Sequence, residues 1–295
     1  MRSTPGSDAS GTRPRVPAPV EPSTLYLVAT PIGNLGDFTA RAIEVLKAVD
    51  CIACEDTRHS RVLLDSYGIA TPTTSLPAFA EGARAEGLVQ RLRDGQSLAL
   101  ISDAGSPAIS DPGERLVAEC VAAGLRVVPV PGPSAVVAAL SASGLPTSRF
   151  HFLGFLPRTQ SEARAMLDEV AGLSATLVLY ESPRRVVETL LVLKDALGDR
   201  PACVAREVTK LHEEFLRGPL SELHATLAAR GEVLGELVLL VHGRTAGARW
   251  SEAEVSAALV AGLGRGERLK TLANEVAKAA GWPSQDVYRL GVSLK

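Results

Sequence analysis

The feature that most constrains the fold is an alternation of short apolar runs with segments of helical periodicity through the first half of the chain. The apolar runs have the length of buried strands and lie at residues 25–29, 51–55, 97–102 and 126–130. Between them, apolar side chains recur every three or four residues, which is the period of an amphipathic helix. Strands that alternate with helices fold by right-handed crossovers into a parallel sheet covered by helices on both faces. The sequence therefore predicts an α/β domain.

Capping residues indicate where these helices begin. Asp37 and Thr39 precede the first helical pattern, and a second pattern lies near residues 86–94. We expect the third helix to begin at Pro112 with Asp111 as its cap, because proline is favoured at the first helical position. Another helix is predicted to follow the turn at residues 131–134.

The second half of the chain predicts a different sheet. The alternation loosens near residues 143–150, and the apolar runs that follow include one at 212–220 with no helical pattern before it. Such a run is typical of an antiparallel hairpin, so this sheet should be mixed. We expect two α/β domains and four segments in all: a disordered tail at 1–23, a parallel α/β domain at 24–143, a mixed α/β domain at 144–243 and a helical segment at 250–295.

Charge and composition exclude several classes of protein. A net charge of −2 predicts no strong nonspecific attraction to nucleic acid or anionic membranes. The segment 244–295 differs, with eight Lys or Arg against five Asp or Glu. No apolar run reaches the ~20 residues that a membrane helix needs, and the N-terminal segment lacks the apolar centre of a secretory signal. We therefore expect a cytoplasmic protein with no membrane partner.

Cys51 and Cys54 form a C-x-x-C pattern, which is often a metal or redox site. They lie in a predicted strand, where side chains three positions apart point to opposite faces. We expect buried thiols here and no metal.

Three loops rich in glycine and proline follow predicted strands, at residues 30–38, 102–113 and 131–134. In open parallel sheets, ligands bind beyond the carboxyl ends of the strands. The loops contain no Lys or Arg, and neither G-x-G-x-x-G nor a phosphate-binding loop is present. Rigid backbone of this kind suits a ligand rich in hydrogen-bonding edges, such as adenosine with an amino-acid tail. Ordinary structural turns remain the alternative.

Charged runs follow three other predicted strands: "CEDTRHSR" at 54–61, "YESPRR" at 180–185 and "REVTKLHEE" at 206–214. Each could be a solvated surface cluster, but three such runs at strand ends favour a site.

Together with "LISDAGSPAISDPG", "VPVPGPSAVVAALSASGLP" and "GFLPR", these motifs resemble the ribosomal RNA small subunit methyltransferase I family, in the tetrapyrrole-methylase-like class. The resemblance extends from about residue 25 to 243, and more loosely beyond. It implies a two-domain homodimer that holds S-adenosylmethionine in the cleft between its domains. It also implies methylation of the ribose 2′-hydroxyl of a cytidine in the decoding region of small-subunit (16S) rRNA, as free RNA or in the assembled subunit.

The resemblance implies site residues as well. Those expected at the cosubstrate are Pro31, Ile32, Gly33, Asp103, Ala104, Gly105, Ser106, Ala108, Ile109, Pro133, Ser134 and Tyr180. From position and residue type, the catalytic candidates, among which we expect the proton acceptor, are Glu55, Asp56, Arg58, Glu181, Glu207 and Lys210. Arginine stays charged and grips two oxygens, so it suits phosphate. The cations expected at RNA are Arg58, Arg184, Arg185, Arg206, Arg268 and Lys270.

Two other functions stay open at this stage. One is methylation of a tetrapyrrole or other small molecule by the same fold. The other is a noncatalytic RNA-binding protein of ribosome assembly, which would not bind S-adenosylmethionine. The basic helical segment at 250–295 is interpreted either as an RNA-docking module or as a cap that stabilises a dimer.

Overall fold

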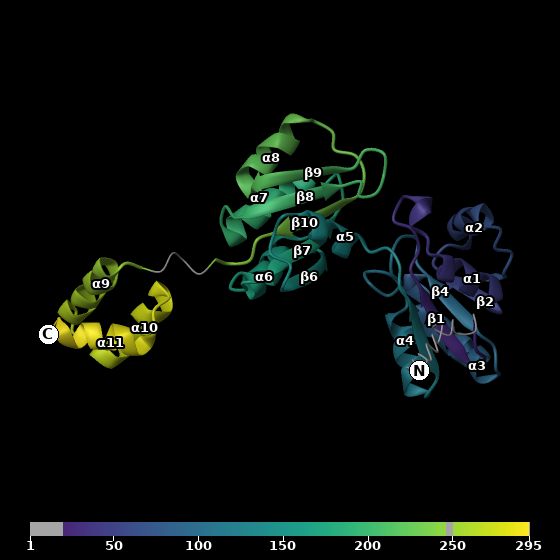
Figure 1. Cartoon of the computed structure of the whole chain (residues 1–295), viewed down its shortest axis with the longest axis horizontal. Helices are drawn as coiled ribbons and strands as arrows, with labels where there is room; N and C mark the ends of the chain where they lie inside the picture. Colours follow the sequence, from purple (N-terminus) through teal and green to yellow (C-terminus); the bar gives the residue numbers. More distant parts are fainter. Residues whose placement is uncertain (1–19, 246–249, 295) are drawn as a thin grey trace, which may run out of the picture. The chain divides into compact units, whose positions relative to one another are not determined.

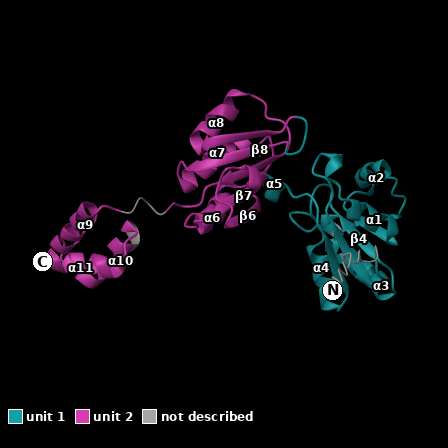
Figure 2. Cartoon of the chain, in the orientation of Figure 1, with its two compact units in different colours: residues 1–138, 208–211 teal, residues 139–207, 212–295 magenta. Residues whose placement is uncertain are grey.

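The computed structural model describes residues 20–245 and 250–294, which form two compact units (Figures 1 and 2). Unit 1 runs to Ala138 and includes Val208–Leu211, and unit 2 holds the rest. The division thus lies before the expected boundary at 143. Residues 1–19 of the expected tail lie outside the described residues. Within residues 20–23, the Glu21 amide donates to the Tyr26 hydroxyl over 2.7 Å.

The unit 1 sheet is parallel throughout, as predicted. Its strand order is β3-β2-β4-β1-β5. The strands are β1 (Thr24–Val28), β2 (Cys51–Cys54), β3 (Thr73–Ser75), β4 (Leu98–Ile101) and β5 (Arg126–Val130). We did not predict β3, because three polar residues give no apolar run.

Helices cover both faces of this sheet. Because side chains alternate along each strand, each face forms a separate core with its own helices. Cys54 packs in a core with α1 (Ala40–Ala48) and α2 (Thr57–Ser66). Cys51 packs in a separate core with α3 (Glu81–Arg93) and α4 (Glu114–Ala122). The prediction that the two thiols are buried and face opposite sides is confirmed.

Some predicted helix starts are wrong. Thr39 does cap α1, but Asp37 lies in the short helix η1 (Leu35–Asp37). The helix α3 begins at Glu81, after η2 (Ala78–Ala80), and not near residue 86. The helix α4 begins at Glu114 and not at Pro112, since Gly113 with φ 131° is its N-cap residue. Asp111 is therefore not a cap.

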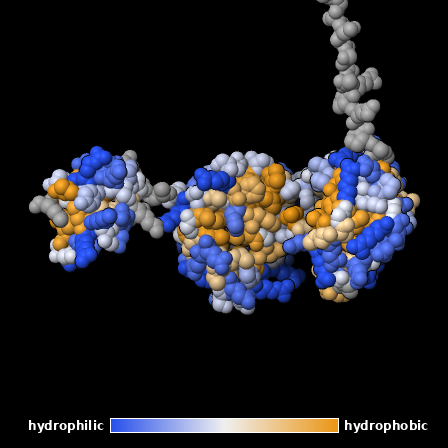
Figure 3. Space-filling view, turned by 90° about the horizontal axis from the view of Figure 1, so that it is seen from below, coloured by the Kyte–Doolittle hydropathy of each residue, from blue (hydrophilic) through white to orange (hydrophobic). Residues whose placement is uncertain are grey.

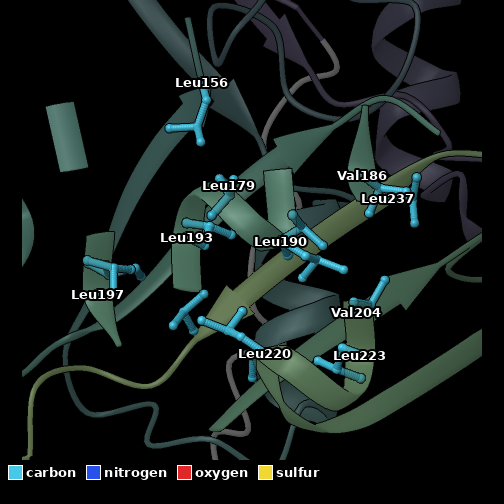
Figure 4. Close-up of a cluster of buried hydrophobic side chains, with 14 of the residues drawn as sticks. Leu156, Leu179, Val186, Leu190, Leu193, Leu197, Val204, Leu220, Leu223 and Leu237 are labelled. Carbon is cyan, nitrogen blue, oxygen red and sulfur yellow. The ribbon is translucent and has the colours of Figure 1, made fainter. Parts of the chain in front are cut away.

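The unit 2 sheet is mixed, as predicted, with strand order β6-β7-β10-β8-β9. Its strands β6 (Phe150–Phe155) and β7 (Thr176–Glu181) are parallel. The strands β8 (Pro201–Arg206), β9 (Glu214–Pro219) and β10 (Leu237–Val241) pair antiparallel. The unit also holds the second half of α5 (Ala135–Ala142), together with α6 (Gln160–Val170), α7 (Val186–Leu197) and α8 (Leu220–Ala229). Leucines and valines from these strands and helices form one core (Figure 4).

The C-terminal helices form a small core of their own. They are α9 (Glu252–Gly264), α10 (Leu269–Ala280) and α11 (Ser284–Ser293). A three-residue connection with Gly281 in the left-handed conformation joins α10 to α11, which is typical of a helix-turn-helix. The face of this segment seen in Figure 3 mixes hydrophilic with apolar residues. Among the described helices, none combines the length and apolar character needed to cross a bilayer.

Candidate functional site

The carboxyl ends of β1, β4 and β5 meet at one edge of the unit 1 sheet, because these strands are parallel. Beyond this edge, Thr30 and Gly105 exchange both backbone hydrogen bonds, with N···O distances of 2.9 and 3.1 Å. The Thr30 hydroxyl donates to the Ser102 carbonyl over 3.0 Å, and the Ser102 hydroxyl donates to the Gly105 carbonyl over 2.9 Å. The loops after β1 and β4 are thus fastened together.

The loop after β5 packs against the other two. A Cβ atom added to Gly105 would lie 3.4 Å from a methyl carbon of Ile32 and 3.7 Å from the Pro133 carbonyl oxygen. A Cβ on Gly132 would lie 2.9 Å from that of Ala29, too close for an unshifted side chain. Backbone therefore approaches backbone here, as the glycine-rich sequence predicts. The structure brings Ile32, Gly105 and Pro133 together, and the other expected cosubstrate residues of unit 1 lie in the same three loops.

The loop after β4 is held in an uncommon conformation. Ala108 and Ser110 have φ of 65° and 61°, values that non-glycine residues seldom adopt. Such a residue costs of order 1–3 kcal/mol and persists only where its surroundings fix it. Strained residues gather at ligand sites, which favours a binding role for this loop over an ordinary turn.

The same edge carries an acidic field. Burial, followed by the charges of Glu55 and Asp103, raises the pKa of Asp111 to about 6. With no cation in the three loops, this field disfavours phosphate and favours a positively charged group. The sequence pattern predicts a helix cap at Asp111, because Pro112 follows it, and gives no sign of this electrostatic role. Within residues 20–245 and 250–294, no group of three or more His, Cys, Asp or Glu is arranged to hold a metal ion.

The segment Val208–Leu211 belongs to unit 1 and lies against the loop after β1. The Lys210 side chain lies across the backbone of Gly33, whose φ is 138°. The Thr209 hydroxyl donates to the Asp37 carboxylate. Lys210 is therefore placed beside the expected cosubstrate residues.

The structure gives three of the proposed catalytic carboxylates other tasks. Asp56 caps α2, with its Oδ1 accepting from the Arg58 amide over 2.8 Å. Glu181 is buried and accepts from the Thr189 hydroxyl over 2.6 Å and the Ser182 amide over 2.7 Å. Both of its oxygens thus accept hydrogen bonds within unit 2, and its role as a proton acceptor stays a prediction.

Glu207 is the third of these carboxylates. Its Oε1 accepts from the Glu236 amide over 2.9 Å, and its side chain fills the space beside Gly235. It fastens the turn before β10. The half-buried Glu55, at the end of β2, keeps its place beside Asp111.

The proposed RNA-contacting cations also separate into two groups. Arg185 donates to the carbonyls of Leu156 and Pro157 over 3.2 and 3.0 Å, and Arg206 pairs with Glu214 over 3.1 Å. These two guanidinium groups make contacts within unit 2, and their role as phosphate ligands stays a prediction. Exposed cations remain at Arg58, Arg184, Arg268 and Lys270; that of Arg58 pairs with Asp56 over 3.2 Å.

Tyr180 belongs to β7 of unit 2, whereas the three loops belong to unit 1. Its ring makes an edge contact with Phe152, with ring centres 5.0 Å apart, and a tilted contact with Phe155 at 5.5 Å. The structure thus assigns Tyr180 to an aromatic cluster and leaves its cosubstrate role a prediction.

The chain is similar to proteins of known family. Residues 24–224 match the family of Tetrapyrrole (Corrin/Porphyrin) Methylases. A Mesorhizobium japonicum protein named Ribosomal RNA small subunit methyltransferase I is 47% identical over 282 residues, 95% of each chain. A Halalkalibacterium halodurans protein of the same name is 43% identical, covering 90% of this chain and 94% of its own.

A solved structure shares the fold. Uroporphyrin-III C-methyl transferase from Thermus thermophilus, solved in complex with S-adenyl homocysteine, superposes with a TM-score of 0.52. Its sequence identity is 20%, and the match covers 74% of this chain and 96% of that one. The expected architecture, with one parallel and one mixed α/β sheet, is confirmed.

Proposed function

This chain belongs to the tetrapyrrole (corrin/porphyrin) methylase family, and within it to the ribosomal RNA small subunit methyltransferase I family; on that premise we propose that it uses S-adenosylmethionine to methylate 16S rRNA. The acceptor is the ribose 2′-hydroxyl of a cytidine in the decoding region. The protein works as a cytoplasmic homodimer, on the free RNA or on the assembled small subunit.

The observation that carries this proposal is a ligand edge built from backbone and carboxylates, whose three loops contain no Lys or Arg of their own. Backbone amides and carbonyls of the loops after β1, β4 and β5, which include exposed residues, suit the edges of adenosine and the methionine carboxylate. Glu55, Asp103 and Asp111 suit the positive charges of the sulfonium and amino groups. A nucleotide phosphate has no matching partner in these loops.

S-adenosylmethionine supplies a methyl group that its sulfonium already activates. The protein's tasks are therefore to align the ribose oxygen with that methyl and to take the hydroxyl proton. Alignment alone can contribute as much as ~7–11 kcal/mol to lowering a barrier. The two fastened loops and their strained residues provide a rigid surface for it.

We assign the proton transfer to Lys210, with Glu55 as the alternative. Both remain at the site edge after the other candidates are accounted for. A positioned base typically adds about 10²–10⁴-fold to a rate. Arg58 and Arg184 are proposed to hold RNA phosphates beside the reacting ribose, because both are exposed to solvent.

The C-terminal helix-turn-helix is proposed to dock on RNA through Arg268 and Lys270, which are exposed at the start of α10. A helix N-terminus and two cations suit a phosphate backbone. A role in stabilising the dimer is the alternative, because Val260, Tyr288 and Val292 leave apolar surface exposed on the same segment.

Two measurements test the proposal. Calorimetry should show that the purified protein binds S-adenosylhomocysteine, whereas a noncatalytic assembly protein would show no binding. Mass mapping of small-subunit rRNA from cells with and without the protein should then show one ribose-methylated cytidine that disappears with it. An unchanged rRNA pattern, together with methylation of an added tetrapyrrole, would instead identify a small-molecule methyltransferase.

A further inference from the structure

One carboxylate from α3 anchors the far end of the loop after β4. The loop ends at Gly113, and the amides of Gly113, Arg115 and Leu116 all donate to Glu81 Oε1, over 3.0, 2.9 and 3.2 Å. The N-cap residue Gly113 has no side chain with which to cap α4, so Glu81 supplies the cap from a distant part of the sequence.

This contact is strong for a physical reason. The first amides of a helix have no partner within it, and they carry the positive end of the helix dipole. A carboxylate that accepts several of them forms charge-assisted hydrogen bonds, about twice as strong as neutral ones. Since Glu81 occupies the N-terminus of α4, a phosphate has no place there.

The loop is therefore fixed at both ends. Its near end is fastened by the exchanged backbone bonds of Thr30 and Gly105, and its far end by Glu81. Ala108 and Ser110, with their left-handed backbone, lie between these two anchors. Strained residues need such fixed surroundings to keep their conformation.

We propose that Glu81 is a positioning residue for cosubstrate binding: it holds the far end of the loop so that residues 103–109 keep the geometry that binds the nucleoside. It acts through the α4 amides and does not touch the cosubstrate. The proposal rests on the proposed function, because it needs the loop to be the cosubstrate site.

The test compares Glu81→Ala and Glu81→Gln with Glu86→Gln, which changes an exposed carboxylate on the same helix. Calorimetry should show that E81A binds S-adenosylhomocysteine at least about tenfold more weakly than the wild type. E81Q should show an intermediate loss of affinity, and E86Q should show no change. In methyl transfer to small ribosomal subunits, E81A should raise the KM for S-adenosylmethionine while kcat at saturation stays within about twofold. Amide exchange at Gly113 and Leu116 should accelerate in the same order.

The outcomes separate this proposal from the one it rests on. If the wild-type protein does not bind S-adenosylhomocysteine, the proposed function fails and this inference falls with it. If the wild type binds and E81A binds equally well despite faster exchange at Gly113, the positioning role is overturned and the cap only stabilises α4. A fall in kcat with KM unchanged overturns it too. Should E81A not fold, E81Q decides, because its amide oxygen still accepts hydrogen bonds.

Discussion

Lys210 lies across the backbone of Gly33, so closely that a side chain at position 33 would collide with its methylene groups. Gly33 also has a φ of 138°, in a region that other residues rarely adopt. Two independent constraints thus require glycine at this point, where the segment Val208–Leu211 covers the loop after β1. This pairing connects a proposed cosubstrate residue to the proposed proton acceptor.

Replacing Gly33 should therefore disturb both the binding of the cosubstrate and the position of the proposed proton acceptor. Gly33→Ala is expected to weaken binding of S-adenosylhomocysteine by about tenfold or more, because it strains the loop and displaces Lys210. Gly68→Ala is the matched control, since Gly68 also has a positive φ, 62°, but open space around its Cα. It should lower the free energy of unfolding by about 1 kcal/mol and leave binding unchanged. Wild-type affinity in G33A would exclude the loop after β1 from the site.

The role of the Lys210 amine can be tested while an apolar side chain of similar length still covers the Gly33 backbone. Lys210→Met keeps an apolar stem of similar length and removes the amine. If Lys210 takes the proton, kcat should fall by about 10²–10⁴-fold while S-adenosylhomocysteine binds as before.

Lys210→Arg distinguishes a base from a mere positive charge, because guanidinium does not deprotonate in proteins. K210R should be as inactive as K210M. Undiminished methyl transfer in K210M would eliminate Lys210 as the base and direct attention to Glu55, with Glu55→Gln as the next variant.

Local sequence predicted the features whose causes are local. The opposite faces of Cys51 and Cys54 follow from the two-residue period of a strand, and the Thr39 cap from the side chain next to its helix. The close backbone approach among the loops after β1, β4 and β5 was predicted from the glycine and proline residues in those loops. Each of these needs only neighbouring residues.

Features that depend on partners far along the chain could not be predicted in this way. We expected Asp111 to cap α4, but the cap is Glu81, 32 residues from Gly113. Arg185 donates to the Leu156 and Pro157 carbonyls, 29 and 28 residues away, and its own sequence neighbours gave no sign of these bonds. The sequence alone does not show whether a charged side chain forms a hydrogen bond or an ion pair with a residue far along the chain.

Glu214 shows how such a partner sets stability. It accepts hydrogen bonds from both terminal nitrogens of Arg230, each over 2.7 Å, and from Arg206 over 3.1 Å. The Arg230 hydrogen bonds, supported by Arg206 and only partly opposed by burial, lower the pKa of Glu214 from 4.5 to about 2. Because the folded-state pKa lies below the unfolded one, this stabilisation is complete above pH 4.5 and is lost as the pH falls toward 2.

Glu214→Gln should therefore lower the stability of unit 2 by about 1–3 kcal/mol at pH 7, and by progressively less below pH 4.5. Hydrogen exchange of the β8 and β9 amides measures it. Glu232→Gln, at an exposed position nearby, should change nothing. A loss in E214Q that is equal at pH 7 and pH 3 would contradict the ion-pair origin.

Asp111 should show the opposite pH dependence. Its pKa is raised from 3.8 to about 6, first by burial and then by Glu55 and Asp103. The unfolded chain releases this proton before the folded chain does, so the folded state loses stability as the pH rises from 3.8 to about 6. Asp111→Asn should consequently stabilise unit 1 by about 1–3 kcal/mol at pH 8 and have no effect at pH ~3.5.

The same variant tests the acidic field at the site. D111N should weaken the binding of S-adenosylmethionine, which carries the sulfonium charge, more than that of S-adenosylhomocysteine, which lacks it. Calorimetry at pH 8 with both ligands measures the difference. Equal effects on the two affinities would show that Asp111 does not act on the sulfonium.

The C-terminal helices offer a test of how the protein meets RNA. Each phosphate that a cation neutralises contributes about 0.7–0.9 to the slope of log K against log salt concentration. If Arg268 and Lys270 both contact phosphate, the double variant R268Q/K270Q should weaken RNA binding and reduce that slope by about 1.5. The matched control R41Q/K47Q removes the same charge from the exposed face of α1 and should change the slope far less. Binding of S-adenosylhomocysteine should be unaffected in both.

An unchanged slope in R268Q/K270Q would exclude these two cations as phosphate contacts. If removing residues 250–295 then left RNA affinity intact but dissociated the dimer, the segment would be a dimer cap, held by the apolar surface around Tyr288 and Val292.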